Sequence, residues 1–173
     1  SPVKQYALEH DLPLLQPEKL KDETFVGALR AWNADLQIVV AFRMLPEVVW
    51  NMPRLGTFNL HASLLPQYRG AAPINWAVIN GDTETGITTF FLKHEIDTGE
   101  VIQQVRVPIA DTDNVGIVHD KLMMLGGRLV TETVDAILAD AVRPVPQEEM
   151  VVAGELRPAP KIFKDTCRID WSQ

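Results

Sequence analysis

Apolar residues recur every three to four positions in several stretches of the chain, which is the spacing of one face of a helix. The first stretch begins with Ser1 and Pro2, a capping residue followed by a proline at the first helical position, and we expect it to end near His10. The same periodicity, with capping residues and turns at its ends, predicts further helices. The expected helices lie at 1–10, 23–32, 46–50, 73–80 and 114–138.

β-Branched and apolar runs between these helices predict strands. The run 36–42 is almost entirely apolar, as in a strand that a parallel sheet buries on both faces. A second strand ends near Asn59, and two more, at 87–92 and 100–107, are joined by a short polar loop. Strands that alternate with helices predict an α/β layer fold with right-handed crossovers.

The end of the chain has a different pattern. Beyond Asp140 the apolar periodicity weakens and four prolines accumulate, which predicts a trailing strand followed by a linker. Within the preceding helix, the pair Gly126 and Gly127 allows either a bend or the close packing of a neighbouring element.

Composition narrows the class of protein without changing this picture. The chain has 173 residues, of which 46% are hydrophobic and 23% are charged, as in an ordinary globular domain. Its apolar runs are too short to span a bilayer, and its first residues lack the pattern of a signal peptide, so we expect a cytoplasmic protein without a membrane partner.

The net charge and the residues able to bind metals argue against a nucleic-acid-binding protein and a metalloprotein. The net charge of −7 argues against a broad basic face for nucleic acid. A basic stretch from Arg157 to Arg168 is more simply a solvated linker. The single Cys167 and the spacing of the four histidines match no metal motif, so no metal is expected.

The candidate chemistry begins with Asn59 and His61 at the end of a predicted strand. The period-2 alternation of a strand places both side chains on one side and Leu60 on the other. In open α/β sheets, ligands collect at the carboxyl ends of the strands. A carboxylate such as Asp97, in the later polar loop, can orient an imidazole or collect its proton. On spacing alone, the simpler interpretation of His61 is a satisfied buried histidine beside a turn.

Several segments together resemble the folate-dependent formyltransferase family. The decisive combination is Asn-x-His followed by Ser-Leu-Leu-Pro at 59–66, with a later Asp-Thr-Gly at 97–99. The resemblance covers nearly the whole chain through the segments 1–4, 58–74, 81–86, 96–100 and 168–171. It implies a Rossmann-like, open and mostly parallel sheet with helices on both faces.

The resemblance also implies a domain organisation. A catalytic domain at 1–154 precedes a linker at 155–173, which would lead to a C-terminal barrel. A further strand-helix region is expected before Ser1, so we expect the chain to be a fragment. Without that region the sheet has an uncovered edge, which makes self-association conceivable and leaves the oligomeric state open.

The family chemistry implies formyl transfer from 10-formyltetrahydrofolate to an amine, through Asn59, His61 and Asp97. Asn59 and His61 would donate hydrogen bonds to the formyl oxygen as negative charge develops there. Ala62 after the histidine is similar to the family members that act on tRNA or on amino-sugars more than to those that act on a purine precursor. The opening and closing segments resemble the members that act on the amino group of methionine on initiator methionyl-tRNA. The alternatives are a nucleotide amino-sugar as the acceptor, or an inactive folate-binding fragment.

The resemblance further implies which residues bind the folate. The pterin would lie against an apolar strand end and the later polar loop, with the Ser-Leu-Leu-Pro segment as part of the wall. The expected folate-binding residues are Phe42, Arg43, Met44, Leu45, Ser63, Leu64, Leu65, Pro66, Leu92, Lys93, His94 and Glu95.

Overall fold

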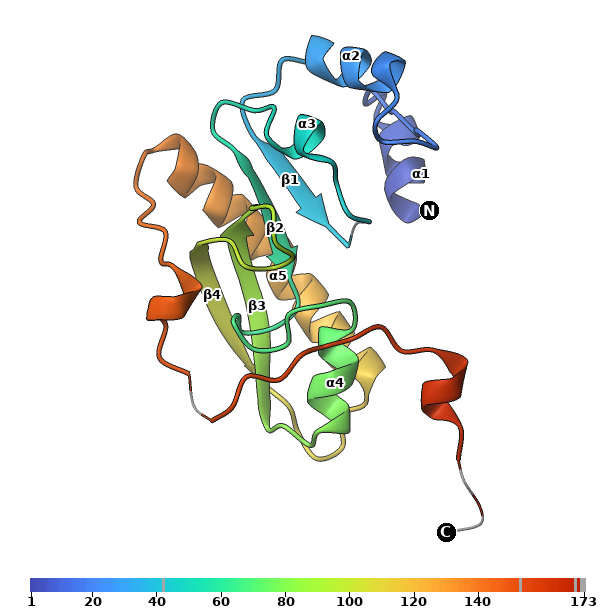
Figure 1. Cartoon of the computed structure of the whole chain (residues 1–173), viewed down its shortest axis with the longest axis vertical. Coiled ribbons are helices and arrows are strands. Elements are labelled where there is room, and N and C mark those ends of the chain that lie inside the picture. Colours follow the sequence, from blue (N-terminus) through green and yellow to red (C-terminus); the bar gives the residue numbers. More distant parts are fainter. Residues whose placement is uncertain (42, 153, 170, 172–173) are drawn as a thin grey trace. The chain divides into compact units, whose positions relative to one another are not determined.

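The computed structural model describes residues 1–41, 43–152, 154–169 and 171. Two compact units make up the chain (Figure 1). The first unit comprises 1–37 and 42–56, and the second unit comprises 38–41 and 57–173.

Three helices form the first unit, and their ends follow local capping rules. Ser1 accepts a hydrogen bond from the backbone of Lys4, and Asp22 accepts one from the backbone of Phe25. These three helices were predicted, and the structure confirms them. Their bounds are α1 Pro2–Glu9, α2 Glu23–Ala31 and α3 Glu47–Trp50.

A four-stranded sheet in the order β1-β2-β3-β4 is the frame of the second unit (Figure 1). The strands are β1 Gln37–Val40, β2 Thr57–His61, β3 Glu84–Phe91 and β4 Val101–Pro108. β1 runs in the same direction as β2, whereas β3 is antiparallel to both of its neighbours. The predicted α/β architecture is confirmed, but the described sheet is mixed rather than mostly parallel. The connection 92–100 between β3 and β4 contains no helix, and it is too short for a parallel crossover.

β1 differs from its sequence prediction in burial. Ile38 is 46% exposed and Val40 is 55% exposed, so the strand is not buried on both faces. β1 is the first strand in the sheet order, and within the described residues β2 is its only neighbour. A largely apolar strand at the edge of a sheet presents its exposed side chains, here Ile38 and Val40, and edge backbone groups that another element can cover.

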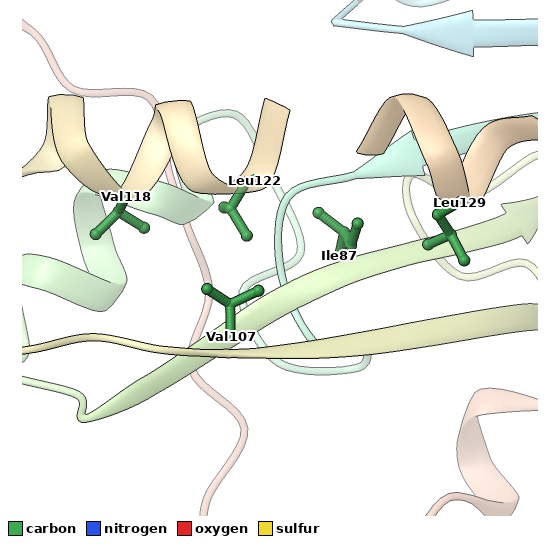
Figure 2. Close-up of a cluster of buried hydrophobic side chains, with 5 residues drawn as sticks. All are labelled: Ile87, Val107, Val118, Leu122 and Leu129. Carbon is green, nitrogen blue, oxygen red and sulfur yellow. The ribbon is translucent and has the colours of Figure 1, made fainter. Parts of the chain in front are cut away.

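The main core lies between one face of the sheet and α5 Val115–Leu138, which begins at the predicted cap Asn114. Figure 2 shows that side chains from β3, β4 and α5 meet in this core. Gly126 faces β2 so closely that an added Cβ would lie 2.8 Å from the Leu60 side chain. The glycine therefore serves close packing. The buried residues of the cluster are Ile87, Val107, Val118, Leu122 and Leu129.

A shorter helix, α4 Pro73–Ile79, packs against α5 and β3 in the second unit. The predicted apolar stripe of this helix is only partly core, because Ala77 is fully buried whereas Ile79 is 59% exposed. Across the described residues, none of the helices combines the length and the apolar character needed to span a bilayer.

The end of the chain contains no trailing strand among its described residues, contrary to the prediction. Two short 3-10 helices occur there, Gln147–Glu149 and Lys164–Cys167, with single bridges from Val145 to β4 and from Ala159 to Gly70. The residues 155–160, here called the tail segment, lie along the turn that follows β2. The prolines remove backbone donors, so the pairing stays confined to isolated positions.

The backbone of the tail segment bonds repeatedly to that turn. Arg157 accepts a hydrogen bond from the Tyr68 N–H at 2.7 Å, and Ala159 donates to the Arg69 carbonyl at 2.8 Å. The Ala159 carbonyl in turn accepts from Ala72 at 3.1 Å. The turn after β2 is therefore held in place by a distant part of the sequence.

Candidate active site

Asn59 and His61 lie on the face of β2 that points away from α5. Leu60 between them packs against the α5 core, so alternation along the strand turns its two neighbours to the other side. Their partners on β3 are Phe90 and Thr88, which share that face. The sequence expectation that the amide and the imidazole face the same side of the sheet is confirmed.

The His61 imidazole is 7% exposed and has a defined neighbour at each nitrogen. Nε2 donates a hydrogen bond to the Tyr68 carbonyl at 2.9 Å. Nδ1 lies 3.8 Å from Oδ2 of Asp97, and the edge of the ring meets Phe90 at a centroid distance of 6.3 Å. Because a carbonyl can only accept, the Nε2 proton is engaged, and Nδ1 is the nitrogen left for chemistry.

Asp97 lies in the loop between β3 and β4 in a left-handed backbone conformation, with φ of 55°. Its side chain is 11% exposed, and Oδ2 accepts a hydrogen bond from the Gly70 N–H at 2.9 Å. Two residues later, the Gly99 Cα packs directly against the Phe91 carbonyl, where no side chain fits. This backbone conformation is unfavourable for a residue other than glycine, so contacts with the surrounding residues must hold Asp97 in it.

Asn59 contributes an unsatisfied polar atom. Its side chain is partly buried, and Oδ1 is buried without a hydrogen-bond partner among the described residues. Buried amides normally have partners, so such an atom needs an explanation. A substrate group with an N–H or O–H would provide the missing donor, whereas the Nδ2 end of the same amide is suited to a carbonyl oxygen.

The loop Ser63–Pro66 folds onto the same side of the sheet, where Thr88 holds it. The Thr88 hydroxyl donates to the Ser63 carbonyl at 2.6 Å and accepts from the Leu65 N–H at 3.1 Å. Gln104 on β4 adds a bond to the Leu65 carbonyl at 2.8 Å. A buried, fully bonded hydroxyl thus fixes a loop without regular structure.

This loop also lines a cavity of about 300 Å³ in the second unit. Leu64, Leu65 and Pro66 form part of its wall, together with Thr85, whose hydroxyl is buried without a partner among the described residues. Asn59, His61 and Asp97 are not part of the described wall. Three of the predicted folate-wall residues therefore line this cavity without the predicted catalytic residues.

The other expected folate-binding residues are divided between the two units. Phe42 lies outside the described residues, while Arg43, Met44 and Leu45 belong to the first unit. Arg43 donates hydrogen bonds to the carbonyls of Pro17 at 2.7 Å and Glu18 at 3.0 Å. Met44 is 74% exposed.

The polar loop after β3 contains the remaining expected folate-binding residues. Leu92 packs against the buried cluster of Leu65, Phe90 and Val101. Lys93, His94 and Glu95 are exposed. Lys93 pairs with Glu100 at 3.3 Å, and the Glu95 carbonyl accepts from the Thr98 hydroxyl at 3.1 Å.

The structure adds partners that sequence reasoning missed. The Tyr68 carbonyl contacts His61 and the Gly70 N–H contacts Asp97, although neither residue was among the expected site residues. Gln147 donates to the carbonyls of Asp97 and Gly99 from within the chain region predicted as a trailing strand. Backbone groups carry no sequence signal, and an isolated glutamine among prolines has no periodicity that would indicate burial.

The arrangement suits proton transfer at a carbonyl centre. Nδ1 of His61 can accept a proton, and the nearby Asp97 carboxylate would stabilise the resulting positive charge. His61 is the last residue of β2, the Asn59 amide lies two positions before it, and Asp97 reaches His61 from the loop between β3 and β4. The donors and acceptors of an acyl transfer are therefore present on one face of the sheet.

Comparison with known proteins decides the family. The sequence model described as formyl transferase matches residues 1–134. The chain belongs to this family. The match contains all three residues Asn59, His61 and Asp97, so the buried polar cluster lies within the formyl transferase region.

Curated relatives of this formyl transferase chain are similar over its whole length. A methionyl-tRNA formyltransferase of Bacteroides fragilis is 88% identical over 173 residues, which is 100% of this chain and 53% of the relative. One from Porphyromonas gingivalis is 54% identical and is covered to 54%. The chain thus spans about half the length of these relatives.

Solved structures share the fold of this formyl transferase chain. HypX from Aquifex aeolicus, in complex with tetrahydrofolic acid, aligns with a TM-score of 0.70 at 25% identity, over 86% of this chain and 25% of that one. A sugar N-formyltransferase from Shewanella aligns with a TM-score of 0.76 at 20% identity, over 100% and 65% of the two chains. The second likeness bears on the fold alone.

Proposed function

We propose that this chain is the catalytic part of an enzyme that transfers the formyl group of 10-formyltetrahydrofolate to the amino group of methionine on initiator methionyl-tRNA. The observation that carries the proposal is the buried approach of His61 Nδ1 to Asp97 Oδ2, at 3.8 Å, in a formyl transferase chain. The choice of acceptor is supported by the relatives that are named methionyl-tRNA formyltransferase.

In the proposed reaction, a bond forms between the methionine nitrogen and the formyl carbon, while the bond from that carbon to N10 of the folate breaks. The proton lost by the amine ends on N10 of the tetrahydrofolate product. His61 accepts the amine proton at Nδ1, because its Nε2 proton is held by the Tyr68 carbonyl. Asp97 stabilises the protonated ring from its fixed position.

Asn59 is assigned to the formyl oxygen. Its amide N–H group donates a hydrogen bond where negative charge develops, and its buried Oδ1, which has no partner among the described residues, accepts from the attacking amine. Once His61 is protonated at Nδ1, it can also donate toward this oxygen. No covalent enzyme intermediate is needed in this scheme.

The folate is assigned to apolar and backbone groups near the strand ends. Leu64, Leu65 and Pro66 supply an apolar wall, and Leu92 packs beside it. The exposed loop residues Lys93–Glu95 complete the part of the site that we assign to the second unit. The reaction would take place in the cytoplasm, with residues 155–173 as the linker from this catalytic part.

A transfer assay on the gene product that contains this chain tests the proposal. We expect formylation of charged initiator tRNA, dependent on 10-formyltetrahydrofolate, and no formylation of nucleotide amino-sugars. Formylation of a nucleotide amino-sugar but not of charged initiator tRNA would overturn the proposed acceptor. Folate binding without transfer to either class would favour a binding module.

Two substitutions test the assigned roles in the same assay. His61→Ala removes the proton acceptor and Asp97→Asn removes the neighbouring charge, and each is expected to lower kcat by about 100-fold or more, with little change in folding. Circular dichroism provides the folding control. A near-normal kcat in either variant would remove that residue from the mechanism.

A further inference from the structure

The side chain of Gln147 uses its whole hydrogen-bonding capacity inside the protein. It is 2% exposed. Nε2 donates to the carbonyls of Asp97 and Gly99, both at 2.8 Å. Oε1 accepts from Nε of Arg69 at 3.0 Å and from Nη2 at 2.7 Å. Two N–H groups and two lone pairs are therefore all satisfied by three residues of two other segments.

These bonds reach the backbone of the Asp97 loop and not its carboxylate. Gln147 holds the backbone carbonyl of Asp97, whereas Gly70 holds the side-chain Oδ2. Arg69, the other partner of Gln147, is the residue before Gly70. One amide thus links the loop that carries the carboxylate to the turn that binds the carboxylate.

The contact explains how Asp97 keeps its backbone conformation. A non-glycine residue with φ of 55° has unfavourable local energy and needs external support. The described support on the backbone of this turn includes the two Gln147 bonds to Asp97 and Gly99, from outside the turn, and one bond within it, from the Thr98 hydroxyl to the Glu95 carbonyl. If these bonds were lost, the turn would relax and the carboxylate would move relative to His61.

We propose that Gln147 is a positioning residue for the His61 and Asp97 pair. It touches neither ring nor carboxylate, but sets the distance between them through the backbone of the Asp97 turn and through Arg69. Its effect on formyl transfer rests on the proposed function. Its effect on the geometry of the pair does not.

Two substitutions of Gln147 separate its hydrogen bonds to the Asp97 and Gly99 carbonyls from its hydrogen bonds with Arg69. Gln147→Met has a similar volume and makes no hydrogen bonds. Gln147→Glu can still accept from Arg69, but its carboxylate cannot donate to the two carbonyls and repels them. Glu149→Gln is the matched control, because this exposed residue lies in the same 3-10 helix.

The first readout is spectroscopic and independent of activity. The Gly70 amide proton is bonded to a carboxylate, so its NMR resonance reports the position of that group. In the gene product that contains this chain, we expect Gln147→Met and Gln147→Glu to shift this resonance toward its value in Asp97→Asn. Glu149→Gln should leave it in place. An unchanged resonance in both folded Gln147 variants would overturn the proposal.

The second readout is kinetic. We expect kcat to fall by about 10- to 100-fold in both Gln147 variants while the KM for the folate changes by less than about threefold, because misplacement of a catalytic group affects the chemical step. A lower melting temperature with unchanged kcat would show a structural role and overturn the proposal. If the wild type transfers no formyl group, the proposed function fails, whereas the Gly70 resonance still decides the positioning role.

A further variant of Gln147 replaces Gln147→Met if that protein is unfolded. If Gln147→Met does not fold, Gln147→Asn keeps the amide but is one methylene too short to span all three partners. The same shift of the Gly70 resonance is then expected in Gln147→Asn. A wild-type resonance together with a wild-type kcat in that variant would overturn the proposal.

Discussion

The Gly70 N–H donates a hydrogen bond to Asp97 Oδ2 at 2.9 Å, across 27 positions of the sequence. The bond joins the turn after β2 to the loop between β3 and β4. Hydrogen bonds to an ionised carboxylate are stronger than those between neutral groups. The position of the Asp97 charge beside His61 therefore depends on the backbone of the turn that contains Gly70. The tail segment in turn stabilises this turn through its own backbone hydrogen bonds.

Gly70→Ala tests this dependence. Gly70 has φ of +126°, and an added Cβ would lie 2.5 Å from the Ala159 carbonyl oxygen. We expect a loss of about 1–3 kcal/mol in the free energy of unfolding, measured in urea, together with slower formyl transfer. Gly127→Ala is the control, since its added Cβ meets nothing within 4 Å. It should be neutral or stabilising by up to about 1 kcal/mol.

Asn59→Ala tests the donor assigned to the formyl oxygen. Removal of one such donor is expected to lower kcat by about 10²- to 10³-fold without loss of folding. Stopped-flow or quench assays of a single turnover would isolate the chemical step. A single-turnover rate within about threefold of the wild type would exclude Asn59 from stabilising the developing charge.

Leu122→Ala tests the core that supports the sheet. Leu122 is 3% exposed in the cluster shown in Figure 2. Truncating such a side chain leaves a cavity, so we expect a loss of about 2–5 kcal/mol in the free energy of unfolding. Its neighbour Met123 is 57% exposed, and Met123→Ala should change stability by about 0.5 kcal/mol or less. Equal effects of the two substitutions would contradict the packing of α5 on the sheet.

Asp113, before α5, links stability to pH. The Lys121 ammonium and, to a smaller extent, the Ala110 N–H bond its carboxylate and hold the pKa of Asp113 below its ordinary value. Since the folded pKa is depressed, this stabilisation is present above the unfolded pKa and is lost as the pH falls through the folded pKa. We expect Asp113→Asn to destabilise the protein at pH 7.

The difference between wild type and Asp113→Asn should narrow in acid below the unfolded pKa of about 3.9. Urea unfolding of both proteins at neutral and acidic pH measures this difference. If the difference in the free energy of unfolding between the two proteins stays constant across that pH range, the charge of the Asp113 carboxylate is not the cause of the destabilisation.

Local elements were largely predictable from the chain. Ser1 and Asn114 cap the helices that they were expected to begin, because a cap acts on backbone groups only three positions away. Gly126 was expected to permit a bend or close packing, and the structure decides for close packing against Leu60. Alternation along β2 correctly placed Asn59 and His61 together.

Pairing across the chain was less predictable. The run 36–42 was expected to be buried on both faces, yet Ile38 and Val40 are exposed, since burial depends on what else packs on the strand. The predicted trailing strand is a pair of isolated bridges with a 3-10 helix between them. Hydrophobic pattern alone does not specify which segments meet.

By itself, the sequence determined the α-helices, the strands of the sheet, the facing of Asn59 and His61, and the resemblance to formyltransferases. These follow from interactions over a few positions or from the residue types themselves. Tertiary structure decided the partners of the site, which are the Tyr68 carbonyl, the Gly70 N–H and Gln147. Two of these are backbone groups that every residue possesses, and the third is separated from Asp97 by 50 positions, so only the folded chain reveals them.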